Sequence, residues 1–322
     1  MIPDEPASDL HVVTGGAGFI GSHLVSALLE RGLPVRVVDD FSTGKRENLP
    51  DSVEVLSGDV CDLARRAVEG AAVVYHLAAQ VSVPRSIEKP MATHWATEAS
   101  TVAVLDQAER AGVRRVVLAS SSAVYGDAPD LEKREDQAPA PASPYAAAKW
   151  CSEIHARHWA LHRNLETVSL RFFNVYGPRQ DPASPYAAAI PIFVSKLLAG
   201  QPVPVFGDGL QTRDFTFVED VVRGILAAAD APDASGRVVN IASGTGTTIL
   251  ELIGTLAELL GRESSIESRP PRAGDLRHSR ADIAAARALL HFVPATSLRA
   301  GLRRTIDWFL QQRTPSRKRS LR

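Results

Sequence analysis

The feature that most constrains the fold is a run of glycines between an apolar strand and a helix. Residues 10–14 read LHVVT, and the run Gly15-Gly16-Ala17-Gly18-Phe19-Ile20-Gly21 follows directly. Gly15 permits a tight turn, Gly18 lets the backbone approach a pyrophosphate, and Gly21 lets the helix lie close to the sheet. The N-terminus of that helix faces the negative charge. The run therefore predicts a dinucleotide-binding turn, with Phe19 and Ile20 also in contact with the cofactor.

The first half of the chain alternates apolar, strand-like runs with helical patterns. Examples of the runs are PVRVVDD, SVEVLSGDV, AVVYHLAA and RRVVLASSS. Strands that are almost continuously apolar are buried on both faces, so the pattern predicts an α/β fold with a Rossmann-type, doubly wound parallel sheet. After residue 173 the pattern loosens into Pro- and Gly-containing loops, which predicts a second, smaller C-terminal α/β substrate lobe. We place a nucleotide-binding domain at 1–173, the substrate lobe at 174–312 and a basic tail at 313–322.

Composition excludes several classes of partner. The 322 residues carry a formal net charge of −1, so nothing in the overall charge attracts nucleic acid or an anionic membrane. No run of 18 apolar residues and no signal-peptide pattern is found, so we expect a cytoplasmic protein without a membrane partner. The only cysteines are Cys61 and Cys151. We expect both to be buried thiols, and neither a disulfide nor a metal site.

Acidic residues at the ends of the next strands extend the predicted cofactor site. Asp39 lies 18 residues beyond Gly21, near the spacing at which a carboxylate binds the adenine ribose hydroxyls. Such a carboxylate repels a 2′-phosphate, which favours NAD over NADP. The alternative is that Asp39 merely ends a strand in the turn DDFSTG. Asp59, followed by Val60, either borders the adenine pocket or is an ordinary strand-end residue. The remaining cofactor candidates in the turn are Asp40, Ser42, Thr43 and Gly44.

A hydroxyl-rich strand end and a helix carry the predicted chemistry. Ser120-Ser121-Ser122 ends an apolar run, and Tyr145 and Lys149 share one helix face four residues apart. A cation near the phenol lowers its pKa toward neutrality, where it can exchange a proton with an alcohol. A Tyr-x-x-x-Lys pair also occurs in purely structural helices, and a Ser-rich strand end can be a simple turn. Together with the glycine run, however, these residues predict removal of hydride and a proton from a sugar carbinol.

At this point the sequence resembles the extended short-chain dehydrogenase/reductases, and among them the UDP-hexose 4-epimerases, over residues 10–310. The resemblance is carried by TGGAGFIGSHL, DDFSTGKRENL, GDV, HLAAQVSVPRS, SSSAVYG, YAAAK, LRFFNVYGPRQ, VFGDGLQTRDFTFVEDVV and PRAGDLRHS. It implies an enzyme that inverts the C4 hydroxyl of a UDP-sugar such as UDP-glucose or UDP-galactose through a transient 4-keto sugar. It also implies that NAD stays bound through turnover, and that a homodimer forms through helices at residues 95–111 and 145–163.

The resemblance assigns roles residue by residue. Tyr145 is the catalytic base, Lys149 is its partner and a ribose ligand, and Ser121 steadies the C4 oxygen. Leu77, Ala78 and Ala79 run beneath the cofactor, and Phe173 backs the nicotinamide. The implied substrate residues are Ser82, Ser121, Ser122, Tyr145, Asn174, Val205 and Phe206 (a uracil shelf), Arg213 and Arg272 (a diphosphate clamp), Asp275 (a uridine ribose contact) and Ser279. The small Ser279 predicts room for UDP-N-acetylglucosamine or UDP-N-acetylgalactosamine.

Several alternatives stay open at this stage. A UDP-glucuronate 4-epimerase shares the same motifs. Nucleotide-sugar dehydratases and UDP-glucuronate decarboxylases need acid/base residues after the catalytic hydroxyl, where this chain has Ser122 and Ala123. A non-catalytic NAD-binding regulator would typically lack the Tyr or the Lys. The chain also departs from the family at residues 97–101, TEAST in place of Asn-x-x-Gly-Thr, so a cofactor hydrogen bond is expected to be lost or replaced.

Overall fold

The computed structural model describes residues 9–127, 130, 132–181, 189–271 and 277–313, and its centre is a seven-stranded parallel sheet. In spatial order the strands are β12 (Arg237–Ile241), β7 (Glu166–Phe172), β5 (Arg115–Ser121), β4 (Ala71–His76), β1 (Leu10–Thr14), β2 (Val35–Asp39) and β3 (Glu54–Ser57). The order reverses direction between β1 and β4, the place where doubly wound sheets bind ligands. The predicted Rossmann-type sheet is confirmed.

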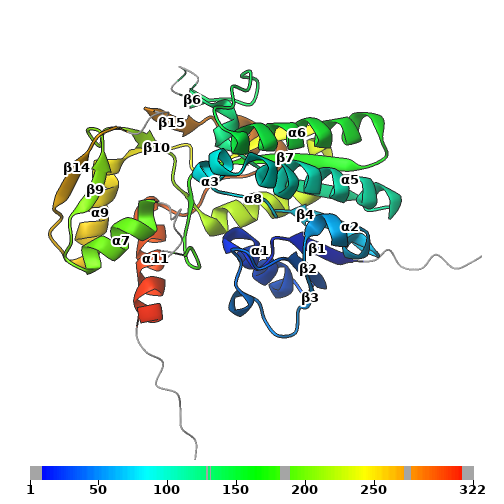
Figure 1. Cartoon of the computed structure of the whole chain (residues 1–322), viewed down its shortest axis with the longest axis horizontal. Coiled ribbons are helices and arrows are strands. Elements are labelled where there is room, and N and C mark those ends of the chain that lie inside the picture. Colours follow the sequence, from blue (N-terminus) through cyan, green and yellow to red (C-terminus); the bar gives the residue numbers. More distant parts are fainter. Residues whose placement is uncertain (1–8, 128–129, 131, 182–188, 272–276, 314–322) are drawn as a thin grey trace, which may run out of the picture.

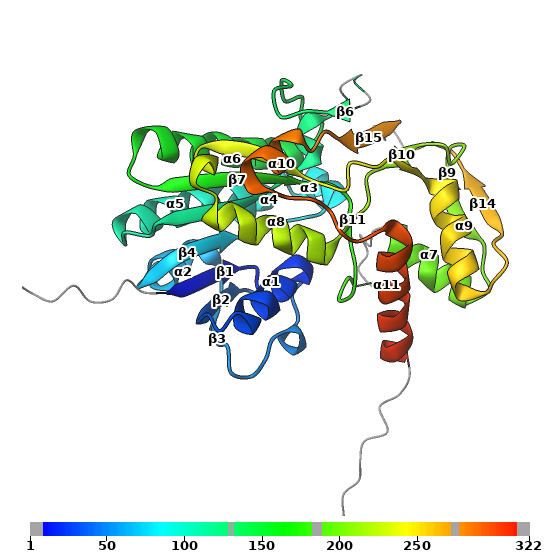
Figure 2. The same cartoon turned by 180° about the vertical axis from the view of Figure 1, so that it is seen from behind.

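Helices cover both faces of this sheet (Figures 1 and 2). One layer contains α1 (Phe19–Glu30), α8 (Val218–Asp230) and α10 (Ala284–Leu290), and the other contains α2 (Val60–Val68), α5 (Ser100–Arg110) and α6 (Pro144–His162). Val13 belongs to the first core and Val12 to the second, and both are 0% exposed. Successive residues of each central strand thus face opposite cores, which is why these strands are almost continuously apolar.

Short helical segments lie mostly in the connections. They are α3 (Val83–Glu88), α4 (Pro90–His94), a π-helical turn at Trp95–Ala99, and 3-10 turns at Arg46–Asn48, Ser122–Tyr125 and Pro232–Ala234. Proline stands in the first turns of α3 and α4, where its missing N–H costs nothing. No helix in the described ranges is long and apolar enough to span a bilayer.

The second lobe is smaller and is built from short strands and three helices. Its four-stranded sheet has the order β13 (Thr247–Thr248), β10 (Thr212–Arg213), β15 (His278–Ala281) and β6 (Glu132–Lys133). Two further pairs are β11 (Thr216–Phe217) with β8 (Val175–Tyr176), and β14 (Ile266–Arg269) with β9 (Val203–Phe206). The helices are α7 (Ala189–Leu198), α9 (Ile249–Leu260) and α11 (Leu298–Arg313), which enclose a separate apolar core. The predicted second α/β lobe is present.

The chain crosses between the two parts more than once. After the predicted boundary at residues 173/174, α8 returns to pack on α1, and β12 pairs with β7 in the first sheet. Conversely, β6 precedes the boundary but pairs with β15 in the second lobe. A cut between residues 173 and 174 would therefore not separate the two structural parts, because each part contains segments from both sides of the cut. The predicted tail starts one residue early, because α11 extends to Arg313.

Candidate active site

The glycine turn is shaped so that only glycine fits at its two ends. Gly15 has a φ of +69°, and a Cβ there would lie 2.8 Å from the backbone nitrogen of Ala78. A Cβ on Gly21 would lie 2.1 Å from the carbonyl oxygen of Gly15. Gly18 caps α1, leaving the N–H groups of the first turn, which includes Phe19 and Ile20, to face an anion. These contacts are what a dinucleotide pyrophosphate needs, and they place Leu77–Ala79 directly beneath the turn.

Asp39 ties the glycine turn to the loop that follows β2. Its Oδ2 accepts a hydrogen bond from the Ala17 N–H at 2.9 Å, and its Oδ1 accepts one from the Phe41 N–H at 2.8 Å. Burial raises the pKa of this carboxyl, and the two backbone bonds lower it. Each oxygen retains a lone pair for a ribose hydroxyl. Asp39 therefore shapes the strand-end turn, as in the alternative above, and can also bind ribose.

The remaining residues of the loop after β2 bond to each other or pack on the glycine turn. Asp40 accepts hydrogen bonds from the N–H and the hydroxyl of Ser42, at 2.9 and 2.6 Å. A Cβ on Gly44 would lie 2.9 Å from both Ala17 and the Asp39 carboxylate, so Thr43-Gly44 packs closely on the glycine turn.

Asp59 acts as a helix cap. Its carboxylate accepts a hydrogen bond from the Cys61 N–H at 2.7 Å at the start of α2, and Val60 beside it is buried. Asp59 thus caps a helix at the strand end, and its place at the border of the adenine pocket stays a prediction. The expectation of two buried thiols is wrong: Cys61 and Cys151 are free but only half-buried, because each lies off the fully buried face of its helix.

Ser121 and Tyr145 meet at the carboxyl end of β5. Ser121 is the last residue of β5, and Tyr145 lies in the first turn of α6, which Ser143 caps by accepting the Ala146 N–H at 3.2 Å. The Ser121 hydroxyl lies beside the Tyr145 phenol and lowers its pKa, and it also accepts the Ala123 N–H at 3.2 Å. Ser122 opens the 3-10 turn beside them. The two hydroxyls are placed to act on one substrate oxygen.

Lys149 is buried one helical turn beyond Tyr145. Its Nζ donates to the carbonyl oxygen of Ala119 at 2.7 Å. Burial lowers the pKa of Lys149 to about 8, and the negative charge of Glu153 opposes that shift. For Tyr145 burial raises the pKa, while the Ser121 hydrogen bond lowers it. The predicted lowering of the Tyr145 pKa by Lys149 is not found here, because the ammonium bonds to the strand and burial of the phenol dominates.

Beneath the cofactor segment lies a polar pair that the sequence pattern did not predict. Thr14 and His76 end two neighbouring strands in register, with Thr14 Oγ1 2.8 Å from His76 Nδ1. Thr14 also accepts the Ala78 N–H at 3.2 Å. Burial, and then the charge of Lys149, lowers the pKa of His76 to about 3, so this ring is neutral. Polar residues at the ends of two apolar runs were the available signal.

Thr97 replaces the asparagine of the family pattern on a π-helical turn, a feature common at functional sites. It is buried, and its hydroxyl accepts the Gln80 N–H at 3.3 Å. The Thr101 hydroxyl in turn donates to the Thr97 carbonyl at 2.6 Å. Thr97 therefore supports the backbone after Leu77–Ala79.

The predicted substrate residues occupy several elements. Ser82 caps α3 by accepting the Arg85 N–H at 3.2 Å, and Asn174 is exposed directly after Phe173, which is fully buried against Tyr125. Arg213 and Ser279 are register partners on β10 and β15, and Ser279 is 5% exposed. Arg272 and Asp275 lie outside the described residues.

The predicted uracil shelf is only partly available. Val205 is buried in the core of the second lobe, so its side chain does not face a ligand. Phe206 is half-buried, and the Arg269 guanidinium lies 5.7 Å from its ring centre. Alternate residues of a strand face opposite sides, which explains why only one of the two side chains can form a shelf.

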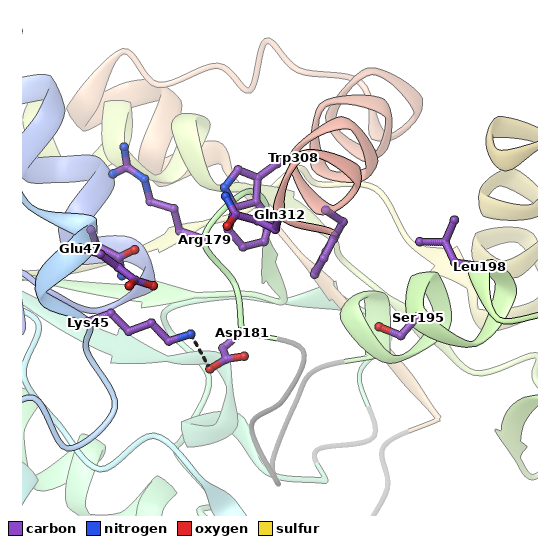
Figure 3. Close-up of a pocket in the computed structure, with 10 residues that line it drawn as sticks. Lys45, Glu47, Arg179, Asp181, Ser195, Leu198, Trp308 and Gln312 are labelled. Atoms are coloured by element: carbon purple, nitrogen blue, oxygen red, sulfur yellow. Dashed lines mark ion pairs between the residues drawn. The ribbon is translucent and has the colours of Figure 1, made fainter. Parts of the chain in front are cut away.

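A pocket of about 300 Å³ lies where the loop after β2 meets the second lobe (Figure 3). Its lining includes Lys45, Arg179 and Trp308, and Lys45 forms an ion pair with Asp181 at 3.1 Å. None of the predicted catalytic residues lines it. This pocket is therefore a junction between the two parts and not the predicted active site.

Comparison with known proteins decides the family. Residues 11–242 match the NAD dependent epimerase/dehydratase family. The chain belongs to this family. A UDP-glucose 4-epimerase of Mycolicibacterium smegmatis is 40% identical over 310 residues, covering 92% of this chain and 97% of the relative.

Solved structures agree with this family membership. A UDP-glucose 4-epimerase of Thermotoga maritima with UDP-glucose has 36% identity and a TM-score of 0.90, covering 94% of this chain and 99% of its own. A UDP-N-acetylglucosamine 4-epimerase of Methanobrevibacter ruminantium in complex with UDP-N-acetylmuramic acid has 35% identity and a TM-score of 0.91, covering 95% and 99%. The cofactor of the family is NAD, as predicted.

Proposed function

We propose that this family member inverts the configuration at C4 of a UDP-linked sugar, with NAD as a bound redox cofactor. The observation that carries the proposal is the meeting of the Ser121 hydroxyl and the Tyr145 phenol at the edge of the sheet where the glycine turn lies. The similarity to 4-epimerases over nearly the whole chain supports the same activity.

The chain supplies proton transfer and orientation. The Tyr145 phenolate accepts the proton of the sugar 4-hydroxyl, and Ser121 holds that oxygen in place. Burial outweighs any effect of Lys149 on the pKa of the neutral phenol, and we propose that the Lys149 ammonium stabilises the phenolate once NAD is bound. NAD, when bound, supplies the acceptor for the C4 hydride and a positive ring that favours ionisation of Tyr145. Because the resulting 4-keto sugar is flat at C4, the hydride held by the cofactor can return to the other face of C4 once the sugar has turned. Tyr145 then returns its proton to the C4 oxygen, which completes the inversion and leaves the cofactor as NAD.

The second lobe contains the proposed binding site for the nucleotide part of the substrate. Arg213 and Arg272 are proposed to bind the diphosphate, since planar guanidinium groups bind phosphate oxygens in pairs. Phe206 offers a ring to uracil, and Asp275 a ribose contact. The small Ser279 supports acceptance of N-acetylated sugars as well as UDP-glucose and UDP-galactose. UDP-glucuronate remains the second candidate substrate.

Elimination and decarboxylation are less well supported. The residues after Ser121 are Ser122 and Ala123, neither of which carries a carboxyl group for removing water from the sugar. The presence of both Tyr145 and Lys149 also favours an enzyme over a non-catalytic NAD-binding regulator.

We also propose a cytoplasmic homodimer. Large apolar side chains are exposed on α4, the π-helical turn and α6: Met91 is 63%, Trp95 59% and Ile154 50% exposed. Trp159 on α6 is held within the chain, since its Nε1 donates to Glu109 at 3.0 Å. The proposed contact is made by the helices around residues 95–111 and 145–163, which contain α5 and α6, and sedimentation of the purified protein tests it.

The test of the function is product analysis. The purified protein is incubated separately with UDP-glucose, UDP-N-acetylglucosamine and UDP-glucuronate, without added NAD. We expect the 4-epimer of at least one substrate, identified by NMR of the sugar ring. Release of water or CO₂ would replace this proposal with one of its rivals, and no reaction with any of the three would contradict it.

A further inference from the structure

An ion pair is buried directly behind the catalytic residues. Glu153 on α6 is 4% exposed and Arg171 on β7 is 3% exposed. Arg171 donates from Nε to Oε1 at 2.9 Å and from Nη2 to Oε2 at 2.7 Å, and Ser120 donates its hydroxyl to the same carboxylate. Such a pair is weak grounds for stability, because apolar residues of similar volume often serve as well. Its position suggests another role.

The carboxylate is the third of three groups along one face of α6. Tyr145, Lys149 and Glu153 recur every four residues, and each contacts one of three consecutive residues of β5. Lys149 donates to Ala119, Glu153 accepts from Ser120, and Tyr145 lies beside Ser121. The helix and the strand end are thus joined at every step, and both views show α6 lying over the strands (Figures 1 and 2). Loosening the Glu153 contact would free the two contacts beside it.

Arg171 connects these contacts between α6 and β5 to the second lobe. Its guanidinium lies 4.5 Å from the ring centre of Tyr125, whose hydroxyl donates to Asn240 at 2.6 Å. The Asn240 amide donates to the carbonyls of Lys133 at 3.0 Å and Asp282 at 3.1 Å. Those two residues lie at the ends of β6 and β15, and β15 carries Ser279. The buried polar chain therefore runs from the catalytic helix to the strand that faces the sugar.

We infer that the Glu153–Arg171 pair is a positioning device for the catalytic residues: it locks the end of β5 to α6 and places a negative charge behind the Lys149 ammonium. The inference rests on the proposed function for the roles of Tyr145 and Lys149. Glu153 is a positioning residue, because it touches Ser120 and Arg171 and reaches the sugar only through its neighbours.

The charges around Lys149 determine whether loss of the Glu153 charge raises or lowers the pKa of Lys149. Among the described residues, Tyr145 and Glu153 face it from α6, and His76 faces it from β4 as a neutral ring. Arg171 on β7 lies behind Glu153 and offsets part of its charge. Loss of the Glu153 charge removes the influence that raises the pKa of Lys149, so the ammonium loses its proton at a lower pH.

The test compares Glu153→Gln with Glu166→Gln in the NAD-loaded enzyme. Glu166 pairs with buried Arg115 at 2.7 Å on the same two strands, β5 and β7, but at their opposite end. We expect Glu153→Gln to lower kcat about tenfold or more with little change in KM, and to move the alkaline limb of the kcat profile down by about one pH unit. Glu166→Gln is expected to leave both unchanged. Equal effects of the two substitutions would overturn the inference.

A second variant tests the inference even if Glu153→Gln fails to fold. Glu153→Leu combined with Arg171→Met replaces both charges by apolar groups of similar size, which commonly preserves stability. We expect this protein to fold with a melting temperature near that of the parent and still to show the lowered kcat. Full activity with an unmoved alkaline limb in the double variant would show that the pair is only structural.

A measurement without substrate separates this inference from the proposed function. The pKa of Lys149 is about 8 in the folded protein, below the ordinary lysine value of 10.5, so the unfolded chain binds more protons between these values and stability rises with pH there. In Glu153→Gln this rise in melting temperature should begin at a lower pH than in Glu166→Gln. Coincident curves would overturn the inference. A shifted curve without turnover of any UDP-sugar would overturn the proposed function alone.

Discussion

Lys149 donates its hydrogen bond to the carbonyl oxygen of Ala119, two residues before Ser121 on the same strand. The cation of the proposed catalytic helix is therefore fixed to the strand that carries the substrate-facing hydroxyl. This arrangement keeps the ammonium close to Tyr145 without a direct bond to it, and it leads to the first two predictions.

Replacing the phenol should stop the chemistry and spare cofactor binding. In Tyr145→Phe the ring remains but the proton acceptor is gone, so we expect kcat to fall by about 10²–10⁴-fold, the range typical for loss of a general base. NAD should remain bound, because the glycine turn is untouched. Product formation and NAD content after gel filtration measure the two effects. An unchanged rate would remove Tyr145 from the mechanism.

The rate should fall at alkaline pH. Burial lowers the pKa of Lys149 to about 8, so the ammonium that we propose stabilises the Tyr145 phenolate is lost as the pH rises through that value. We expect kcat to decline above about pH 8 in the parent protein. Lys149→Met should be slow at every pH and show no such limb. A parent profile that stays flat to pH 10 would contradict this assignment.

Closing the glycine turn with a methyl group should abolish NAD binding. In Gly21→Ala the new Cβ would lie 2.1 Å from the Gly15 carbonyl oxygen, which forces α1 away from the turn. Gly254 in α9 is the matched control, since nothing lies within 4 Å of a Cβ built there. Gly254→Ala should bind NAD normally and be more stable by up to about 1 kcal/mol, because alanine favours helices. Calorimetric NAD titration and thermal unfolding measure both variants.

Filling the site at Ser279 should select against bulky sugars. Ser279 is buried on β15 beside Arg213, so a large side chain there must occupy space on the proposed sugar side. In Ser279→Tyr we expect kcat/KM for UDP-N-acetylglucosamine to fall about tenfold or more relative to that for UDP-glucose. Because the ratio of the kcat/KM values for the two substrates is taken within one variant, it serves as its own control. If the parent turns over UDP-glucose only and the ratio does not change, Ser279 does not limit the choice of sugar.

The sequence could predict those features that depend on local backbone geometry or on spacing within one element. Gly15 and Gly21 are examples, since a tight turn and a close helix each demand a residue without a side chain. Tyr145 and Lys149 are another, since four residues separate them on one helix. The parallel, doubly wound sheet also followed from the alternation of apolar runs and helices.

What the sequence could not reveal depends on contacts between distant segments. Glu153 repeats the spacing of Tyr145 and Lys149, but its partner Arg171 became known only through the register of β5 and β7. The side on which Val205 is buried depends on how β9 packs in the second lobe. Likewise, the sequence around Asp59 does not reveal that this residue caps α2, because the cap depends on its bond to the Cys61 N–H.

The two-residue strand β6 has a consequence for how the protein unfolds. By pairing with β15 it fastens a segment of the first half to the second, while β12 and α8 fasten the second half to the first. Neither half carries a complete sheet of its own, so a fragment ending at residue 173 would lack an edge strand and the helix that covers α1. We therefore regard the chain as a single cooperative unit, and splitting it at its apparent midpoint would yield two incomplete pieces instead of two domains.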